Sequence, residues 1–377
     1  MASSPATAQA MDRAAAAFAA GRTEEAAALC AAVLREEPSH FYALHLACVL
    51  ALQQARWQEA LDLSTRALAV RPGHPEVRAN RGAALRRLDR HAEALAEYDA
   101  VLAAHPQAAD ARNNRGVALA ALGRHEEAIA IWDELFELAR ELGRSRQVLL
   151  NYSSLAYREL YDLGEARSRS EEALELSQSD SFSMPRQFAG SDLLFTDLLG
   201  GDVGAAQAVW QARWDGIEEA TAWTTWLIRG RLAVARAEIA LAAETPESAL
   251  EWAERSLSLA RRTARPKYEA RSLTLVGQSL VALKRGAEAV AALREATVVA
   301  DRLIGAPARW QAWGALGEGA YACGDDLTAA EAFGEAWSLL SSFAATLKPE
   351  RARMLLAAPQ VAAVVASVPV AQRGNTQ

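Results

Sequence analysis

Three prolines divide the first part of the chain at a constant interval. Pro38, Pro72 and Pro106 lie 34 residues apart, twice in succession. Such a period is typical of a helix-turn-helix unit that stacks on its neighbours to bury a continuous apolar face. Proline ends the second helix of a unit because it cannot donate a backbone hydrogen bond and strains the preceding turn. The spacing therefore predicts an α-solenoid, an architecture that favours a binding protein over an enzyme.

The units can be aligned by counting back from these prolines. They begin near Thr7, Phe41, Pro75 and Ala109. Two positions within each unit carry small residues. The eighth residues are Ala14, Cys48, Gly82 and Gly116, and the twentieth are Ala26, Ala60, Ala94 and Ala128. We expect the two helices of each unit to cross at these positions, because a larger side chain would hold their backbones apart.

After residue 143 the regular prolines stop and the interval lengthens. Gly277 and Gly317 are 40 residues apart, as are Ala289 and Ala329. An extra helical turn per unit explains this interval. We expect three parts: residues 7–142 with four strict 34-residue units, residues 143–347 with about five long or degenerate units, and residues 348–377 with a capping helix and tail.

These motifs resemble the tetratricopeptide repeat (TPR) family over almost the whole chain. The string Asn80-Arg81-Gly82 returns as Asn114-Arg115-Gly116, and residues 313–336 fit the same template. The second half is similar to the long-repeat arrays of large bacterial regulators. The resemblance implies an all-α, right-handed TPR superhelix of about nine helical hairpins plus a C-terminal capping helix.

In this family the first helix of each hairpin lines a concave groove, here chiefly residues 40–155. Asparagine is a poor helix former, yet four of the five asparagines fall in predicted first helices. Each amide offers a donor and an acceptor, which suits an extended peptide, although asparagine also packs helices there. The candidate groove residues are Asn80, Asn113, Asn114, Asn151, Tyr42, His45, Arg86 and Arg87.

Motifs for catalysis, for a cofactor or for a metal ion are missing from the sequence. Gly200–Gly204 and Asp325–Asp326 are interpreted as turns or a helix start, and His91 and His125 follow the repeat. The cysteines Cys30, Cys48 and Cys323 are interpreted as buried, reduced thiols. We therefore expect no enzyme, no cofactor and no metal site.

The tryptophans gather in one part of the second half. Trp210 and Trp214 share a helix face, and Trp223 and Trp226 follow. Core packing is the expected role, because Trp210 falls at the aromatic position of its unit. The alternative is a ligand pocket within residues 210–252.

Charge and hydropathy restrict the partners. The net charge is −7 and neither half is basic, so we expect no nucleic acid. The uncharged segment 354–372 contains Pro359 and Pro369 and is expected to cap the array rather than to enter a membrane. No signal peptide is recognised, and the scarcity of lysine indicates a bacterial, cytoplasmic protein. The sequence predicts a non-catalytic scaffold that binds a protein or peptide; the alternative is a ligand- or peptide-sensing regulator.

Overall fold

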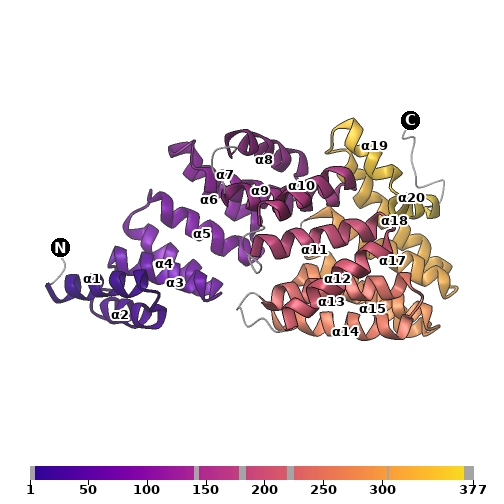
Figure 1. The fold of residues 1–377 in the computed structure, drawn as a ribbon, viewed down its shortest axis with the longest axis horizontal. Helices are drawn as coiled ribbons and strands as arrows, with labels where there is room; N and C mark the ends of the chain where they lie inside the picture. The colour runs from indigo at the N-terminus through magenta and orange to yellow at the C-terminus, as the bar shows by residue number, and fades with distance from the viewer. Residues whose placement is uncertain (1–4, 140–143, 178–183, 219–224, 304, 369–377) are drawn as a thin grey trace. The chain divides into compact units, whose positions relative to one another are not determined.

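The computed structural model describes residues 5–139, 144–177, 184–218, 225–303 and 305–368. These residues form 20 helices and no strand (Figure 1). The predicted all-α solenoid is therefore confirmed. The chain divides into two compact units, Met1–Leu122 and Gly123–Gln377.

The first unit consists of consecutive helices of 13–15 residues. Their bounds are α1 Pro5–Ala19, α2 Thr23–Glu36, α3 Phe41–Gln53, α4 Trp57–Val70, α5 Pro75–Arg87, α6 His91–Ala104 and α7 Ala109–Ala121. Three of the four predicted unit starts, Phe41, Pro75 and Ala109, are the first residues of helices. The first helix begins at Pro5, two residues before the predicted Thr7.

The prolines act as predicted. Helices α2, α4 and α6 end two residues before Pro38, Pro72 and Pro106. Between α1 and α2, Gly21 has φ of +73°, a conformation that side chains with a Cβ rarely adopt.

The helices of a hairpin cross where small residues were expected. Ala14 and Ala26 are fully buried where α1 meets α2. In the α5–α6 hairpin a Cβ placed on Gly82 would lie 2.7 Å from the Tyr98 ring. Tyr98 itself is fully buried, so the glycine makes room for an aromatic side chain of the second helix.

The second unit contains the remaining helices, among which α13–α18 are longer, with 15–19 residues. Their bounds are α8 His125–Ala139, α9 Arg144–Glu159, α10 Leu163–Glu175, α11 Met184–Leu199, α12 Val203–Glu218, α13 Thr225–Ala242, α14 Pro246–Arg262, α15 Pro266–Ala282, α16 Gly286–Ala300, α17 Ala306–Ala322, α18 Asp326–Ala344, α19 Pro349–Ala357 and α20 Pro359–Ser367.

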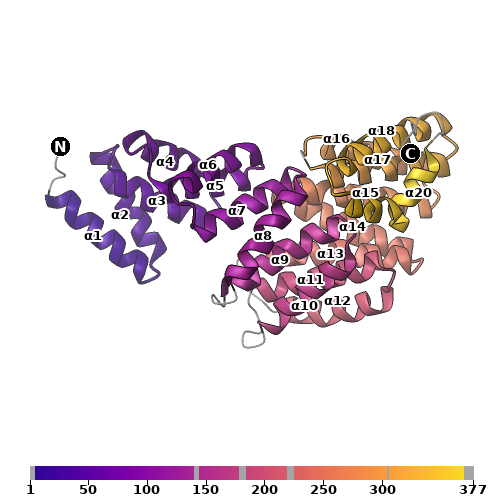
Figure 2. The same ribbon diagram turned by 90° about the horizontal axis from the view of Figure 1, so that it is seen from above.

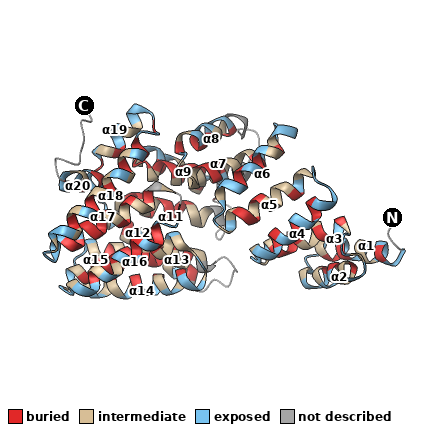
Figure 3. Cartoon of the chain, turned by 180° about the vertical axis from the view of Figure 1, so that it is seen from behind, coloured by how far each residue is buried: buried red, intermediate tan, exposed pale blue. Residues whose placement is uncertain are grey.

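Within the second unit the first helices of successive hairpins form one layer. Each of α9, α11, α13 and α15 packs on the next member of this series, which ends with α17, and all five pack on their own hairpin partners (Figure 2). Buried residues follow the faces where helices meet, and exposed residues follow the turns and outward faces (Figure 3). This layer positions the site described below.

The C-terminal cap consists of two short helices rather than the single one expected. Pro359 ends the first of them, because it disfavours helical backbone at Ala358, which is extended with φ −60° and ψ 135°. Both α19 and α20 pack on α18. Arg351 in α19 forms an ion pair with Glu126 in α8, and Gln360 donates a hydrogen bond of 3.0 Å to the Leu199 carbonyl. None of the described helices combines the length and apolarity needed to cross a membrane.

Candidate functional site

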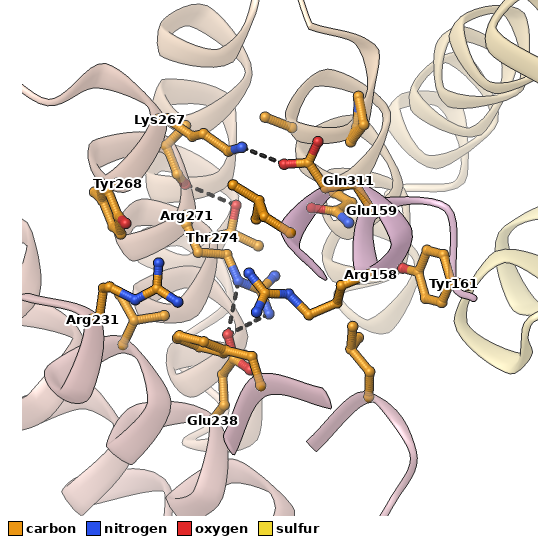
Figure 4. A pocket seen from close by; sticks show the side chains of 17 residues that line it. Arg158, Glu159, Tyr161, Arg231, Glu238, Lys267, Tyr268, Arg271, Thr274 and Gln311 are labelled. Atoms are coloured by element: carbon orange, nitrogen blue, oxygen red, sulfur yellow. Dashed lines mark hydrogen bonds and ion pairs between the residues drawn. The ribbon is translucent and has the colours of Figure 1, made fainter. Parts of the chain in front are cut away.

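A cavity of about 280 Å³ lies against the layer of first helices in the second unit (Figure 4). Residues from α9, α11, α13, α15 and α17 line it, so five consecutive hairpins contribute. The cavity therefore belongs to the stacked array and not to any one hairpin.

Two arginines in this cavity share one carboxylate. Arg158 from α9 and Arg231 from α13 donate to Asp192 Oδ1 at 2.7 and 2.5 Å. Arg231 is 5% exposed and Asp192 is 2% exposed, so the group is buried. Both guanidinium groups also lie over the Phe195 ring, at 5.2 and 5.5 Å from its centroid. This ring and the shared carboxylate hold the arginines side by side.

The protonation of Arg231 is fixed by its partners. Burial by itself disfavours the charged form, but Asp192 and Tyr268 outweigh it and raise the pKa of Arg231 above its ordinary value. The guanidinium is therefore a permanent cation inside the cavity wall.

Two further ion pairs complete the polar wall. Arg271 in α15 donates to Glu238 Oε1 in α13 at 2.7 Å. Lys267, also in α15, forms an ion pair with Glu159, which in turn lies 2.8 Å from His125 Nε2. Burial raises the pKa of Glu159, but the charge of Lys267 and the contacts with His125 outweigh it and hold this pKa well below its usual range. The remainder of the wall is largely apolar, with Leu155, Leu199 and Val234.

A second, more polar cavity of about 510 Å³ lies in the same unit. Arginines that line it form ion pairs with nearby carboxylates. Arg169, for example, donates to Asp133 at 3.0 Å, and its guanidinium lies 4.4 Å from the centroid of the Phe136 ring. Burial raises the pKa of the lining Tyr157 to about 12. We interpret this cluster as an ion-pair network between hairpins.

Five of the groove candidates from the sequence lie in the first unit on α3 and α5, among them Tyr42, His45 and Asn80. Tyr42 is 57% exposed, and the Arg71 guanidinium lies 4.9 Å from its ring centroid. His45 Nε2 contacts Asn80 Nδ2 at 3.2 Å, so the structure brings these two predicted residues together. Burial lowers the pKa of His45 despite the nearby Glu76 carboxylate.

The remaining groove candidates are divided between the units. Arg87 is exposed and lies over the Trp57 ring at 5.4 Å, and Arg86 is half-buried. Asn113 and Asn114 are half-buried on α7. Asn151 is half-buried on α9, in the second unit, and does not line the cavity of Figure 4. Peptide binding by these residues stays a prediction.

The tryptophans form a core, as expected, and not an open pocket. Trp210 is 5% exposed, donates a 2.8 Å hydrogen bond to the Leu232 carbonyl, and stacks on Trp214 at a centroid distance of 5.3 Å. Trp252 meets both rings edge-on. Trp223 and the side chain of Trp226 lie outside the described residues.

Two sequence interpretations need correction. Cys323 is exposed, because it follows the last residue of α17 at a turn, whereas Cys30 and Cys48 are buried as expected. Burial raises the pKa values of these two thiols to about 11 and about 12. His125 follows the repeat but is also part of a polar contact, since it meets Glu159 from α9.

The sequence analysis did not predict the paired arginines of the cavity. Arg158, Asp192 and Arg231 lie on three different helices, at intervals of 34 and 39 residues that are close to the two repeat periods of the chain. This spacing was the usable signal, because residues one repeat apart on successive first helices lie close together when the hairpins stack. Among the described residues, no group of three His, Cys, Asp or Glu side chains could hold a metal ion.

Comparisons with known proteins agree with this architecture. Tetratricopeptide repeat models match residues 17–84 and 84–141. A search of curated proteins finds no significant match. Solved structures with the same fold include a Rap protein complexed with Competence and Sporulation Factor, with a TM-score of 0.65 and 12% identity, over 91% of this chain and 100% of the other.

Two further solved structures share the fold. The apo form of the quorum sensor NprR from B. thuringiensis has a TM-score of 0.63 and 12% identity, over 78% of this chain and 87% of its own. A tetratricopeptide repeat protein from Parabacteroides merdae has a TM-score of 0.54 and 17% identity, over 72% of this chain and 100% of its own. At these identities the similarity shows the fold alone. The family models thus identify tetratricopeptide repeats over residues 17–141, and the described helices beyond them continue the same helical-hairpin architecture.

Proposed function

We propose that this protein is a non-catalytic regulator whose inner cavity in the second unit binds a small ligand or short peptide. The observation that carries the proposal is the cavity itself, lined by five successive first helices. A ligand there would contact every hairpin from α9 to α17 at once. In a solenoid, where each repeat contacts only its neighbours, such a ligand changes how the repeats stack.

The solved structures support the same proposal. One relative in fold is a complex with Competence and Sporulation Factor, and another is a quorum sensor. These descriptions belong to those proteins, but they make ligand sensing a reasonable role for an array of this fold. The protein-interaction role of TPR repeats would then convert ligand binding into altered binding of a protein partner.

The proposal is tested by filling the cavity. We would incubate the full chain with the low-molecular-weight fraction of a bacterial extract and identify retained compounds by mass spectrometry. Ala308 lines the cavity and Ala287 is exposed on α16, so Ala308→Trp is the blocking variant and Ala287→Trp is its matched control. We expect compounds retained by the wild type and by the control to be lost from Ala308→Trp. Equal retention by all three proteins would contradict the proposal.

A second candidate function concerns the first unit, as a scaffold for a protein partner. The observation that favours it is Tyr42, a large side chain 57% exposed beside the Arg71 guanidinium. Tyrosine and arginine are enriched at the energetic centres of interfaces. Pull-down of partners with the triple variant Asn80, Asn113 and Asn114→Ala, and separately with Tyr42→Ala, tests this groove. Unchanged recovery of every partner by both variants would contradict it.

A further inference from the structure

The cavity in the second unit carries an excess of positive charge. Four cations line it: Arg158, Arg231, Lys267 and Arg271. They pair with only three carboxylates, those of Glu159, Glu238 and Asp192. The cations that line the cavity therefore outnumber the carboxylates that pair with them.

The unbalanced charge can be located. Arg271 and Lys267 each have a carboxylate partner of their own, whereas Arg158 and Arg231 share Asp192. Burying two guanidinium groups that share one carboxylate is unfavourable, so a second anion beside this pair is favoured. The excess lies at Arg158 and Arg231.

Arg231 also has one guanidinium nitrogen that makes no hydrogen bond. Its Nε is buried and has no hydrogen-bond partner among the described residues, although the side chain is only 6% exposed. Figure 4 shows Arg231 and Arg158 reaching into the same space from opposite sides. This unbonded N–H leaves the guanidinium incompletely satisfied, which favours a further anion beside its terminal nitrogens.

We infer that the cavity binds a carboxylate carried on an apolar body, with the carboxylate between Arg158 and Arg231. Two guanidinium groups offer the paired donors that a planar carboxylate accepts. Phe195, Leu155 and Val234 provide apolar contacts for the rest of the ligand. This inference rests on the proposed function and specifies its ligand.

The carboxylate has two natural sources, the C-terminus of a short peptide and a small organic acid. The first experimental arm uses pooled apolar pentapeptides made with a free C-terminal carboxylate and with a C-terminal amide. The second uses straight-chain carboxylic acids of six to ten carbons and their primary amides. Inorganic phosphate at the same ionic strength is the third. Binding to the full chain is measured by affinity selection with mass spectrometry and by calorimetry.

We expect one of the first two arms to show carboxylates binding about 10- to 100-fold more tightly than the matched amides, as charged hydrogen bonds predict. The arm that shows it identifies the source. Arg231→Gln should abolish the preference, because it leaves Arg158 and Asp192 balanced. Arg236→Gln, on the same helix but outside the cavity lining, should preserve it. Asp192→Asn adds one excess charge and should strengthen the preference, provided that its helical circular dichroism is unchanged.

Three results would overturn the inference: equal binding of carboxylates and amides, tighter binding of phosphate than of either carboxylate series, or no binding in any arm. Equal binding that Ala308→Trp abolishes would refute the carboxylate specificity while leaving the proposed function intact. A preference that survives Arg231→Gln would equally overturn the assignment to this arginine pair.

Discussion

His125 and Glu159 lie 34 positions apart and meet at 2.8 Å in the second unit. His125 is 1% exposed and begins α8, whereas Glu159 is the last residue of α9 and also pairs with Lys267 from α15. The Glu159 carboxylate therefore connects α8, at the start of the unit, with α15. In the sequence, Lys267 of α15 lies 108 residues after Glu159. Because Glu159 and Lys267 also line the cavity, this contact joins the candidate site to the packing of the unit.

We predict that Glu159→Gln lowers the free energy of unfolding at pH 7 by about 1–3 kcal/mol, the range for charged hydrogen bonds. The folded-state pKa of Glu159 lies below its ordinary value of 4.5. Its stabilisation is therefore complete above the unfolded-state pKa and is lost as the pH falls through the folded-state pKa. The difference between the two proteins should shrink between pH 5 and pH 3 in urea unfolding.

Glu59→Gln is the control for this prediction, because Glu59 forms only an exposed pair with Arg56. Such pairs contribute about 0–1 kcal/mol. A loss for Glu159→Gln no larger than for this control would contradict a structural role for the Glu159 contacts.

The close approach at Gly82 leads to a second prediction. A Cβ there would lie 2.7 Å from the ring of the fully buried Tyr98. We expect Gly82→Ala to destabilise by about 1–3 kcal/mol, because overpacking outweighs the gain in helix propensity. Gly164→Ala, where nothing lies within 4 Å of the new Cβ, should instead be neutral or stabilising by up to about 1 kcal/mol. Thermal unfolding of both variants measures the contrast, and equal shifts would refute it.

The tryptophan core gives a third prediction. Trp210→Phe keeps an aromatic ring but removes the buried hydrogen bond to the Leu232 carbonyl. We expect a loss of about 1–3 kcal/mol, because a buried hydrogen bond is lost together with part of the packing of the larger indole ring. Unfolding followed by circular dichroism gives the value. Stability equal to that of the wild type would show that this bond contributes nothing to the free energy of unfolding. It would favour the alternative of a ligand pocket within residues 210–252.

The sequence predicted those features that arise within one hairpin. The prolines located the ends of α2, α4 and α6, and the spacing of small residues located the crossing at Gly82. It did not predict the cavity, because its walls come from five different hairpins, and spacings of 34 and 39 residues between charged side chains do not by themselves show which of them meet. Arg158, Asp192 and Arg231 become neighbours only through the superhelical stacking of α9, α11 and α13. Local periodicity specifies hairpins, whereas a site built across hairpins depends on the pitch of their stack.

The contact of the cap with the start of the second unit gives the last prediction. Arg351 pairs with Glu126, lies 5.4 Å from the Tyr157 ring centroid, and is 19% exposed. The adjacent Lys348 backbone N–H donates to the same carboxylate at 3.1 Å. We expect Arg351→Met and Glu126→Gln each to destabilise the protein, with a coupling energy of about 0.5–3 kcal/mol in a double-mutant cycle. Arg353→Met on the same helix is the control, since Arg353 bonds only to the Pro349 carbonyl of its own helix. Additive effects of the two variants would mean that the cap and α8 are not energetically coupled.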